Sequence, residues 1–321
     1  MIDEGDLKWE ETACDWCGET QAEMVFSGPD RLERLPGRFY MVRCKRCGLF
    51  RQNPRLAWDS LEQYYPENYT AYTYEPEETN PLRRWILRYG LSKRLRAVEK
   101  HQSSGRLLEI GCGTGAFLEE AVQSGRWEVE GIEPIQKAAE FARRRLNAPV
   151  FHGRFDQAKL QHRLFDVVVM WCVLEHLDQP VQDLRKAHSL LEDKGWLIFS
   201  IPNIESLELK LFGKFWAGWD LPRHLYLFPR PLLHTILNSI GFKVIEERCL
   251  TTAYAQMGHN LEFWSQSWQP QYPWLNSLIR KGYYNWFTRL VSGVPFAVLD
   301  RLCLTTNLTI FAQKVDTPIQ S

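Results

Sequence analysis

Apolar residues recur along the middle of the chain, from about residue 80 to about residue 250, in two alternating patterns. Short runs rich in branched and aromatic residues have the length and composition of buried β-strands, namely RLLEIGC, EVEGIEP, FDVVVMW and WLIFSIPN. Between them, segments with apolar residues three or four positions apart are typical of amphipathic helices, namely TGAFLEEAVQSG, QKAAEFARRRL and QPVQDLRKAHSLLEDKG. Strands that alternate with helices of about 10 to 15 residues predict a parallel sheet covered on both faces.

The alternation continues toward the C-terminus and then changes character. PLLHTILNSIGF predicts another helix, KVIEERCL a strand, and LTIFAQK at 308–314 the last strand. Between these two strands lies an aromatic-rich insertion, in which six apolar residues fall on one face of a predicted helix: Leu275, Leu278, Ile279, Trp286, Leu290 and Val294. The pattern favours packing on the sheet or over a pocket. A homodimer interface and peripheral contact with a membrane are the alternatives.

The composition is ordinary for a globular protein, with 45% apolar and 24% charged residues among 321. The 39 basic and 39 acidic residues cancel, so the chain as a whole has no electrostatic attraction to nucleic acid or to an anionic membrane. Its acidic start, MIDEGDLKWEE, lacks the profile of a signal peptide, and no apolar run reaches the roughly 18 residues of a membrane span. We therefore expect a cytoplasmic protein, with peripheral membrane contact as the open alternative.

Four of the eight cysteines form two identical C-x-x-C-G motifs, CDWCG at 14–18 and CKRCG at 44–48. In a chain without an export signal, such pairs favour a metal site over disulfides. Four thiolates close a tetrahedral zinc site, which is then structural, and they are supplied here by Cys14, Cys17, Cys44 and Cys47. The segment 1–75 is thus predicted to be a zinc-ribbon module. Its aromatic stretch, YYPENYTAYTY, is interleaved with acids rather than bases, so no nucleic-acid partner is expected.

A glycine-rich turn, LLEIGCGTGAFLEEA, leads from an apolar strand into a helix. Glycines at such a turn allow the backbone to bend sharply and to approach a ligand near the helix N-terminus. The next strand, VEGIEP, ends at Glu133, where a carboxylate can accept hydrogen bonds from both hydroxyls of a ribose. The spacing G-x-G-x-G, with Glu109 just ahead, differs from the G-x-G-x-x-G of dinucleotide-binding proteins.

At these residues the chain resembles the class I S-adenosylmethionine-dependent methyltransferases. EIGCGTG matches their first motif, GIEP their second, and FDVVVMWCVLEHLDQP the strand and loop that follow. The resemblance implies an α/β fold with a Rossmann-like seven-stranded sheet whose last strand is antiparallel. It also implies that the cofactor S-adenosylmethionine lies across the carboxyl ends of the first four strands. The cofactor-binding residues carried over by position are Glu109, Gly111, Gly113, Gly115, Glu133, Asp156, Trp171 and Cys172.

The resemblance also implies a role for each of these residues. The three glycines approach the methionine part of the cofactor, Glu109 braces the loop and the cofactor amine, and Glu133 binds the ribose. Asp156 is expected to contact adenine, while Trp171 and Cys172 flank the cofactor. For Cys172 the alternative is a small buried residue without a role in binding.

A second motif, DLPRHLYLF at 220–228, places an arginine and a histidine among large apolar residues. Here the chain resembles small-molecule methyltransferases with an N-terminal zinc ribbon, many of which act in sugar, surface-polysaccharide and natural-product pathways. The related deoxysugar C-methyltransferases use a histidine at the matching position as base, which makes His224 a candidate general base. The alternative is that Arg223 and His224 anchor this loop. The other candidates for catalytic roles, each with a structural alternative, are Glu175, His176 and Tyr226.

Four segments are predicted: a zinc-ribbon module at 1–75, a methyltransferase core at 76–250, an aromatic helical insertion at 251–307, and the final strand and tail at 308–321. The predicted function is S-adenosylmethionine-dependent methylation at oxygen or carbon of a small molecule, a sugar, or a surface-glycan or natural-product intermediate. One alternative is an RNA or protein methyltransferase that uses the ribbon as a reader, although no [DN]-P-P-[YF] run follows FDVVVMW. Another is a non-catalytic cofactor-binding scaffold.

Overall fold

The computed structural model describes residues 2, 4–66, 81–162, 164–250, 253–267, 272–283, 295–296 and 298–315. The chain divides into two compact units, each assembled from segments that are distant in sequence. The sheet unit comprises Tyr65–Ser200, His234–Glu246 and Ile310–Ser321. The cysteine unit comprises Met1–Tyr64, Ile201–Leu233 and Glu247–Thr309. The sequence predicts four consecutive segments, whereas each of these two units combines three separate stretches of chain. The four-segment organisation stays a prediction.

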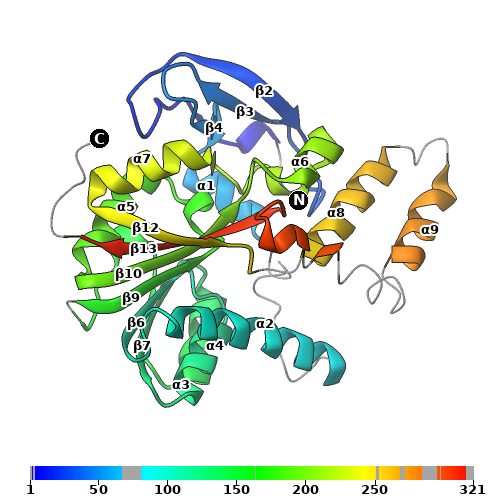
Figure 1. The fold of residues 1–321 in the computed structure, drawn as a ribbon. Helices are drawn as coiled ribbons and strands as arrows, with labels where there is room; N and C mark the ends of the chain where they lie inside the picture. Colours follow the sequence, from blue (N-terminus) through cyan, green and yellow to red (C-terminus); the bar gives the residue numbers. More distant parts are fainter. Residues whose placement is uncertain are drawn as a thin grey trace. The chain divides into compact units, whose positions relative to one another are not determined.

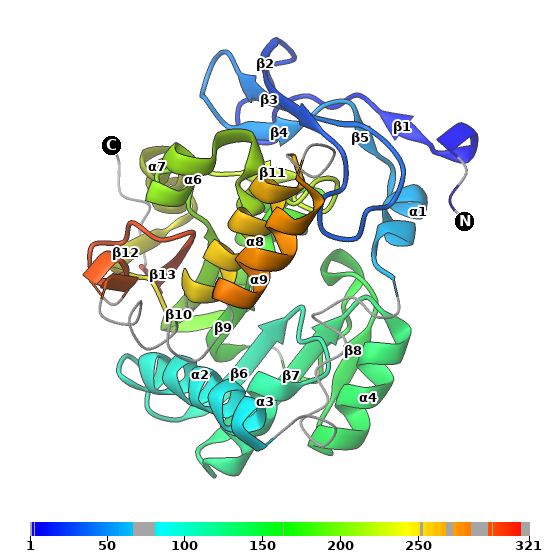
Figure 2. The same cartoon turned by 90° about the vertical axis from the view of Figure 1, so that its right-hand side faces the viewer.

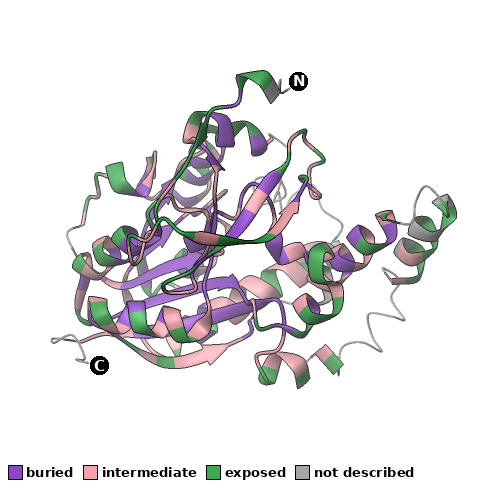
Figure 3. Ribbon diagram, turned by 90° about the horizontal axis from the view of Figure 1, so that it is seen from above, coloured by how far each residue is buried: buried purple, intermediate pink, exposed green. Residues whose placement is uncertain are grey.

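The sheet unit is built on a mixed seven-stranded sheet with the strand order β12–β13–β10–β9–β6–β7–β8 (Figure 1). The strands from β10 to β8 pair in parallel and β13 is antiparallel, which confirms the predicted sheet. Figure 3 shows many buried residues in these strands, as expected for a sheet covered on both faces. The strands are β6 (Gly105–Ile110), β7 (Trp127–Glu133), β8 (Val150–His152), β9 (Phe165–Trp171), β10 (Leu191–Pro202), β12 (Phe242–Arg248) and β13 (Asn307–Lys314).

Helices cover both faces of this sheet. Helices α2, α3 and α4 pack side by side on one face, and α5 and α7 lie on the other (Figure 1). The helices are α2 (Pro81–Glu99), α3 (Ala116–Gln123), α4 (Gln136–Leu146), α5 (Pro180–Ser189) and α7 (Arg230–Ile240). Helix α4 shows why they pack: its buried residues share one stripe of the helix, namely Ala138, Ala139, Ala142 and Leu146.

The helix after β9 ends earlier than the sequence predicts. The pattern extends it over 179–195, whereas α5 stops at Ser189 and Leu191 already pairs with Phe165 of β9. The register of β10 shifts between Leu191 and Trp196, so the polar residues between them occupy an irregular part of the strand. The leucines at this boundary fit the apolar spacing of a helix and that of a strand, and they belong to the strand because they pair with β9.

The cysteine unit contains a four-stranded antiparallel sheet in the order β11–β4–β3–β2 and a two-stranded pair, β1–β5. Strand β11 joins the N-terminal strands from far along the chain, with Tyr226 opposite Arg51. The strands are β1 (Trp9–Glu10), β2 (Ala22–Gly28), β3 (Phe39–Cys44), β4 (Phe50–Gln52), β5 (Arg55–Leu56) and β11 (Tyr226–Leu227). The α-helices are α1 (Trp58–Leu61), α6 (Leu207–Phe212), α8 (Ala253–Gln266) and α9 (Pro273–Tyr283).

Helices α8 and α9 pack side by side within the predicted aromatic insertion (Figures 1 and 2). On α9, Trp274 is 60% exposed and Leu278, from the predicted apolar face, is 58% exposed. Trp286, Leu290 and Val294 of that face lie outside the described residues, so the homodimer and membrane alternatives stay predictions. Within the described ranges, every helix is too short or too polar to cross a bilayer.

Candidate functional site

The turn after β6 has a backbone that favours glycine. Gly111, Gly113 and Gly115 have φ values of 71°, 54° and 78°, which lie in the left-handed region. A Cβ atom on Gly111 would lie 2.6 Å from Cγ2 of Val173, and one on Gly115 would lie 2.9 Å from Cδ1 of Leu146. The three predicted glycines therefore form the sharp turn expected at the start of α3.

Glu133 ends β7 and faces this turn. Its carboxylate accepts hydrogen bonds from the backbone N–H groups of Gly113, at 2.8 Å, and Ile135, at 2.9 Å. Burial raises the pKa of this carboxyl to about 7, while the two N–H groups act in the opposite direction. Each oxygen has a further lone pair, so the carboxylate can still accept two hydroxyl donors.

Glu109, on β6, is a second buried carboxylate. The residue is 3% exposed, and its Oε2 atom has no hydrogen-bond partner among the described residues. Burial raises the pKa of this carboxyl well above its usual range, Arg94 opposes that shift and Glu133 adds to it. Because a buried polar atom without a partner is unfavourable, the site is suited to a ligand that brings positive charge and hydrogen-bond donors.

Arg94, on α2, is a site residue that the sequence reasoning missed. Its guanidinium lies 5.1 Å from the centroid of the Trp171 ring and interacts electrostatically with Glu109 and Cys172. In the sequence it belongs to the basic stretch RRWILRYGLSKRLR, whose many Arg and Lys residues predict a solvent-exposed helix face. The available signal is its position four residues before the buried Val98, on the same side of the helix.

The other predicted cofactor residues lie at strand ends and in the turns after them. Trp171 ends β9 and packs edge-on against Phe117, with 5.3 Å between ring centroids. Cys172 follows with a φ of 57°, and burial raises the pKa of its thiol to about 12. Asp156 lies in the 3-10 helix η3 (Phe155–Gln157), where its carboxylate pairs with Arg154 at 3.2 Å. Arg94 thus connects Trp171 with Glu109, whereas Asp156 pairs with Arg154.

Glu175 and His176 belong to the next 3-10 helix, η4 (Leu174–His176). Glu175 is fully buried, and its charge raises the pKa of the Cys172 thiol. Nδ1 of His176 lies 3.0 Å from the hydroxyl oxygen of Tyr65, within the sheet unit. A catalytic role for either residue stays a prediction.

The four motif cysteines come together in the cysteine unit, with their Sγ atoms within 4.8 Å of one another. In the first motif, the N–H of Gly18 donates to the carbonyl of Cys14 at 2.9 Å. In the second, the N–H of Gly48 donates in the same way to the carbonyl of Cys44 at 3.0 Å. Two matching turns therefore direct four sulfurs toward a common point, which suits a tetrahedral metal ion.

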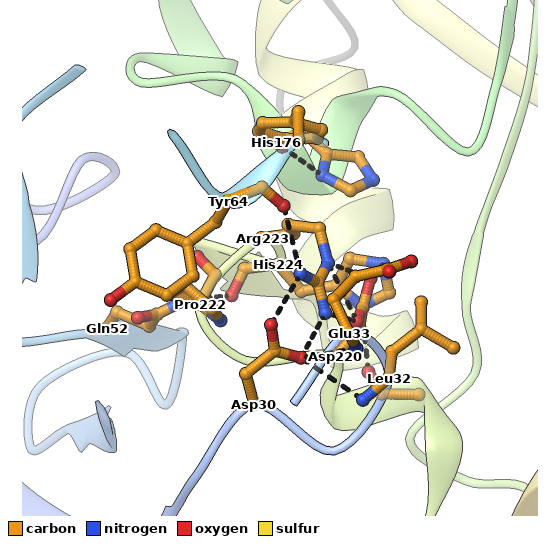
Figure 4. A network of polar contacts seen from close by, with 12 residues as sticks. Asp30, Leu32, Glu33, Gln52, Tyr64, His176, Asp220, Pro222, Arg223 and His224 are labelled. Atoms are coloured by element: carbon orange, nitrogen blue, oxygen red, sulfur yellow. Dashed lines mark hydrogen bonds and ion pairs between the residues drawn. The ribbon is translucent and has the colours of Figure 1, made fainter. Parts of the chain in front are cut away.

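His224 lies in a compact turn before β11 (Figure 4). Burial lowers the pKa of its imidazole, with Asp220 acting in the opposite direction, so the neutral ring is favoured. Nδ1 lies 2.9 Å from the carbonyl oxygen of Gly218 and therefore carries the proton, because a carbonyl only accepts. Nε2 is thus the proton-accepting nitrogen, and it lies 3.8 Å from Oδ2 of Asp220.

Tyr226, the other candidate near this turn, is a core residue of the cysteine unit. It is 2% exposed, and its hydroxyl accepts a hydrogen bond from Nη1 of Arg55 at 3.3 Å. The neighbouring Arg223 is fully buried between Asp30 and Asp220. Arg223 thus makes contacts of the kind expected of a loop anchor, and so does Nδ1 of His224 at the Gly218 carbonyl. The role of His224 as a base stays a prediction.

A small pocket in the cysteine unit adjoins Asp220. Its lining includes four aromatic side chains and two charged ones, namely Phe26, Trp216, Trp219, Phe263, Arg31 and Asp220. The rings contact one another, with the Trp219 centroid 5.1 Å from that of Phe26 and 5.6 Å from that of Trp216. The pocket has room for about one water molecule, so these rings form a packed aromatic cluster beside Asp220.

Comparison with known proteins identifies the central region of the chain. Residues 82–247, just over half of the chain, match the model of a family described as "Methyltransferase domain". The chain belongs to this methyltransferase family. The match begins after both cysteine motifs, so it says nothing of a zinc ribbon.

Relatives of this methyltransferase include two O-methyltransferases of ubiquinone biosynthesis. That of Bordetella avium is 29% identical over 178 residues, which are 48% of this chain and 70% of the relative. That of Burkholderia thailandensis is 27% identical over 208 residues, which are 60% of this chain and 81% of the relative. The crystal structure of a possible histamine N-methyltransferase from Thermotoga maritima is 27% identical, with a TM-score of 0.42, and covers 54% of this chain and 81% of its own. In a third such relative, from Bordetella bronchiseptica, the match covers only 44% of the relative's length.

Family membership, the seven-stranded sheet and the glycine turn together make the protein a class I S-adenosylmethionine-dependent methyltransferase. The prediction of an enzyme of this class is thereby confirmed. The residues present also fit the cofactor: a buried carboxylate oxygen of Glu109 lacks a partner among the described residues, and neither Gly111 nor Gly115 has room for a Cβ atom.

Proposed function

We propose that this methyltransferase acts at an oxygen or carbon atom of a small molecule, such as a sugar, a surface-glycan or a natural-product intermediate. The observation that carries the proposal is the neutral His224, whose Nδ1 proton is held by the Gly218 carbonyl and whose Nε2 faces Asp220, beside a cluster of aromatic side chains. Hydroxyl and carbon acceptors must lose a proton when they are methylated, and a neutral imidazole is a suitable base. The names of the ubiquinone O-methyltransferases among its relatives support a small-molecule acceptor.

The cofactor is assigned to the glycine turn and the acidic residues beside it. When bound, S-adenosylmethionine supplies an electrophilic methyl group on a sulfonium. Glu133 accepts hydrogen bonds from the ribose hydroxyls, and Oε2 of Glu109 accepts one from the ammonium group. The guanidinium of Arg94, held near Glu109 and over Trp171, binds the carboxylate. The glycines let the backbone approach the methionine part without side chains in the way.

Cofactor affinity is expected to fall as the pH is lowered from about 8 to about 6. Because burial raises the pKa of Glu133 to about 7, the ionised acceptor of the ribose hydroxyls is present above that pH and is lost as the pH falls through it. The affinity then drops by at most about tenfold per pH unit. Calorimetric titration with S-adenosylhomocysteine measures the effect. Glu133→Gln should bind more weakly and without this pH dependence, and a wild-type affinity that is the same at both pH values would contradict the assignment.

Arg94→Met is expected to weaken binding of S-adenosylhomocysteine by about 10- to 100-fold, because a charged hydrogen bond to the carboxylate is lost. The methionine side chain still covers Trp171. Methylthioadenosine lacks the carboxylate, so the variant should bind it as the wild type does. Arg88→Met is the matched control, since Arg88 lies on the same helix but pairs with Glu120 at 3.0 Å. Equal losses for both ligands would mean that Arg94 only stabilises the fold.

His224 is assigned as the general base. Nδ1–H is held by the Gly218 carbonyl, so the ring presents Nε2 to the proton of the acceptor. The acceptor proton would pass to Nε2 while the acceptor atom bonds to the methyl carbon in place of the sulfonium sulfur, which leaves as a neutral thioether. The imidazolium that results would be stabilised by the Asp220 carboxylate. The proton is then released to solvent, which restores the neutral ring.

The four cysteines are assigned to one structural zinc ion. The ligand set is complete with Cys14, Cys17, Cys44 and Cys47, so no coordination position is left for an acceptor or a water molecule. Arg46 donates from Nη1 to the carbonyl of Cys17 at 3.3 Å and brings positive charge toward the thiolates. We therefore assign the metal to folding of the cysteine unit and not to the methyl transfer.

A labelling experiment tests the proposed function. The purified protein is incubated with methyl-labelled S-adenosylmethionine and an extract of its source cells, and the products are separated into lipid, soluble, protein and nucleic-acid fractions. Label in the soluble or lipid-glycan fraction is expected and identifies the pool that holds the acceptor. Label confined to protein or nucleic acid would overturn the proposal in favour of a reader-type methyltransferase. No label, with cofactor binding intact, would also overturn it.

A further inference from the structure

Arg223 is a buried cation whose hydrogen bonds are complete. It is 0% exposed, and Nε donates to both carboxylate oxygens of Asp220 at 3.1 and 3.2 Å. Nη1 donates to Oδ2 of Asp30 at 3.0 Å and to the carbonyl of Tyr64 at 3.1 Å. Nη2 donates to Oδ1 of Asp30 and to Oδ1 of Asp220, each at 2.7 Å. All five N–H donors of the guanidinium thus have acceptors, and any rotation would leave buried donors unpaired.

Asp30 is held rigidly by its own loop. Oδ1 accepts hydrogen bonds from the backbone N–H groups of Leu32 and Glu33, both at 3.1 Å, which closes a turn of the kind that aspartate favours. The residue is 3% exposed, and its two oxygens meet two nitrogens of Arg223 in a bidentate arrangement (Figure 4). Asp30 is therefore the end of the network that fixes the orientation of the guanidinium.

Asp220 links this network to His224. Its carbonyl accepts from the N–H groups of Arg223, at 2.8 Å, and His224, at 3.0 Å. Its φ of 30° is uncommon for a residue other than glycine, so the turn depends on the contacts that hold it. Gln52 donates from Nε2 to the carbonyls of Pro222 and His224, at 2.8 and 2.7 Å, and so holds the backbone separately. What Arg223 controls is the carboxylate of Asp220.

We propose that Asp30 is the positioning residue for His224, because it orients Arg223, which in turn orients the Asp220 carboxylate that faces the imidazole. The inference rests on the proposed role of His224 as general base, and it connects that base to a loop 193 residues before Arg223. Two carboxylates outnumber the one guanidinium, and Glu33 interacts electrostatically with all three groups. The excess negative charge stabilises the imidazolium that forms when His224 takes a proton.

Nuclear magnetic resonance of the full chain, labelled with ¹⁵N at histidine, tests the proposal without any acceptor. In the wild type, the His224 ring should be a single neutral tautomer with its proton on Nδ1, assigned by loss of its signals in His224→Gln. Asp30→Asn puts an amide N–H against an arginine donor, so the Asp220 carboxylate loses its fixed orientation and stabilises the imidazolium less. The pH at which the ring takes up its second proton should therefore fall, while the Gly218 carbonyl keeps the neutral tautomer. Arg223→Lys should lower that pH in the same way, because lysine keeps the charge but lacks the planar fork. Glu33→Gln, the matched control, removes a negative charge but keeps the pair between Asp30 and Arg223, and it should lower that pH less.

Affinity for S-adenosylhomocysteine and zinc content establish that each variant is folded. A wild-type ring with its proton on Nε2 overturns the proposal without any variant, and so does a folded Asp30→Asn protein whose His224 ring titrates at the same pH as in the wild type. The rate of methyl transfer from the labelled cofactor to the extract should fall by about 10- to 100-fold in Asp30→Asn, as is usual for a misplaced catalytic group. If the titration of the ring shifts in Asp30→Asn while His224→Ala keeps full turnover, the positioning is real and the proposed base is wrong. If His224→Ala is inactive while Asp30→Asn matches the wild type in both readouts, the base stands and this inference fails.

Discussion

His224→Ala is expected to lower the rate of methyl transfer from the labelled cofactor to the extract by a factor of about 10² to 10⁴. Its affinity for S-adenosylhomocysteine should not change. The reason is that the acceptor loses the group that removes its proton, while the residues we assign to the cofactor lie on other elements of the chain and are unchanged. The wild-type rate should also decline toward acid pH, because a base must be neutral to act. Burial lowers the pKa of His224, so this decline should occur below the pH at which an exposed histidine is protonated. The variant should lack the decline.

The matched control for this prediction is His234→Ala, since His234 lies on α7 and belongs to neither predicted site. It should retain both turnover and cofactor affinity. Near-normal turnover in His224→Ala would show that His224 only anchors the turn with Gly218 and Asp220. A loss of cofactor affinity in His224→Ala would indicate a general defect of folding. The rates of methyl transfer in His224→Ala and His234→Ala would then have to be compared at saturating cofactor.

Removal of zinc is expected to unfold the cysteine unit and to destabilise the protein more than any of the substitutions named above. Cys14 and Cys44 are buried, at 3% and 2% exposed, and without a metal their thiolates would repel one another or take up protons. In structural zinc sites the binding free energy, about 10–16 kcal/mol in small zinc-finger peptides, is free energy of folding. Metal analysis should find one zinc per chain. Calorimetry should show Tm lowered by more than about 10 °C in the presence of 1,10-phenanthroline.

Cys44→Ser is the corresponding variant and should lose zinc together with stability. Cys303→Ser is the control, because Cys303 is a half-buried thiol outside the cluster. Its sulfur lies 3.8 Å from the Glu247 carbonyl oxygen, and a serine hydroxyl can donate to the same carbonyl. This variant should keep one zinc and a nearly unchanged Tm. A purified wild-type chain that holds no metal and melts at the same temperature with and without the chelator would contradict the assignment.

Features that depend on neighbouring residues were predictable from the sequence. The order of strands and helices follows from the period of apolar residues, and the sheet has the seven strands expected, with β13 antiparallel. The glycine turn and Glu133 follow from the junction of a strand and a helix, where the backbone needs positive φ values. The turns of the two C-x-x-C-G motifs are likewise local, since the N–H of each glycine donates a hydrogen bond to the carbonyl of the first cysteine in its own motif. Even here the predicted C-terminal end of α5 is wrong. The helix ends at Ser189 because the residues after it pair with β9, although their apolar spacing also fits a helix.

The tertiary structure decided which residues meet across long stretches of chain. Arg94 looks like part of a solvated basic helix, and only the packing of α2 brings it to Trp171 and Glu109. Asp30 carries no local signal, and it acquires a partner only because a loop from the N-terminal segment meets Arg223. The sequence by itself determined the fold class, the glycine turn and the cysteine motifs, since these arise from backbone preferences and side-chain period over a few residues. The surroundings of His224 and Glu109 arise from contacts between distant segments, and a local pattern holds no information about which distant segment arrives there.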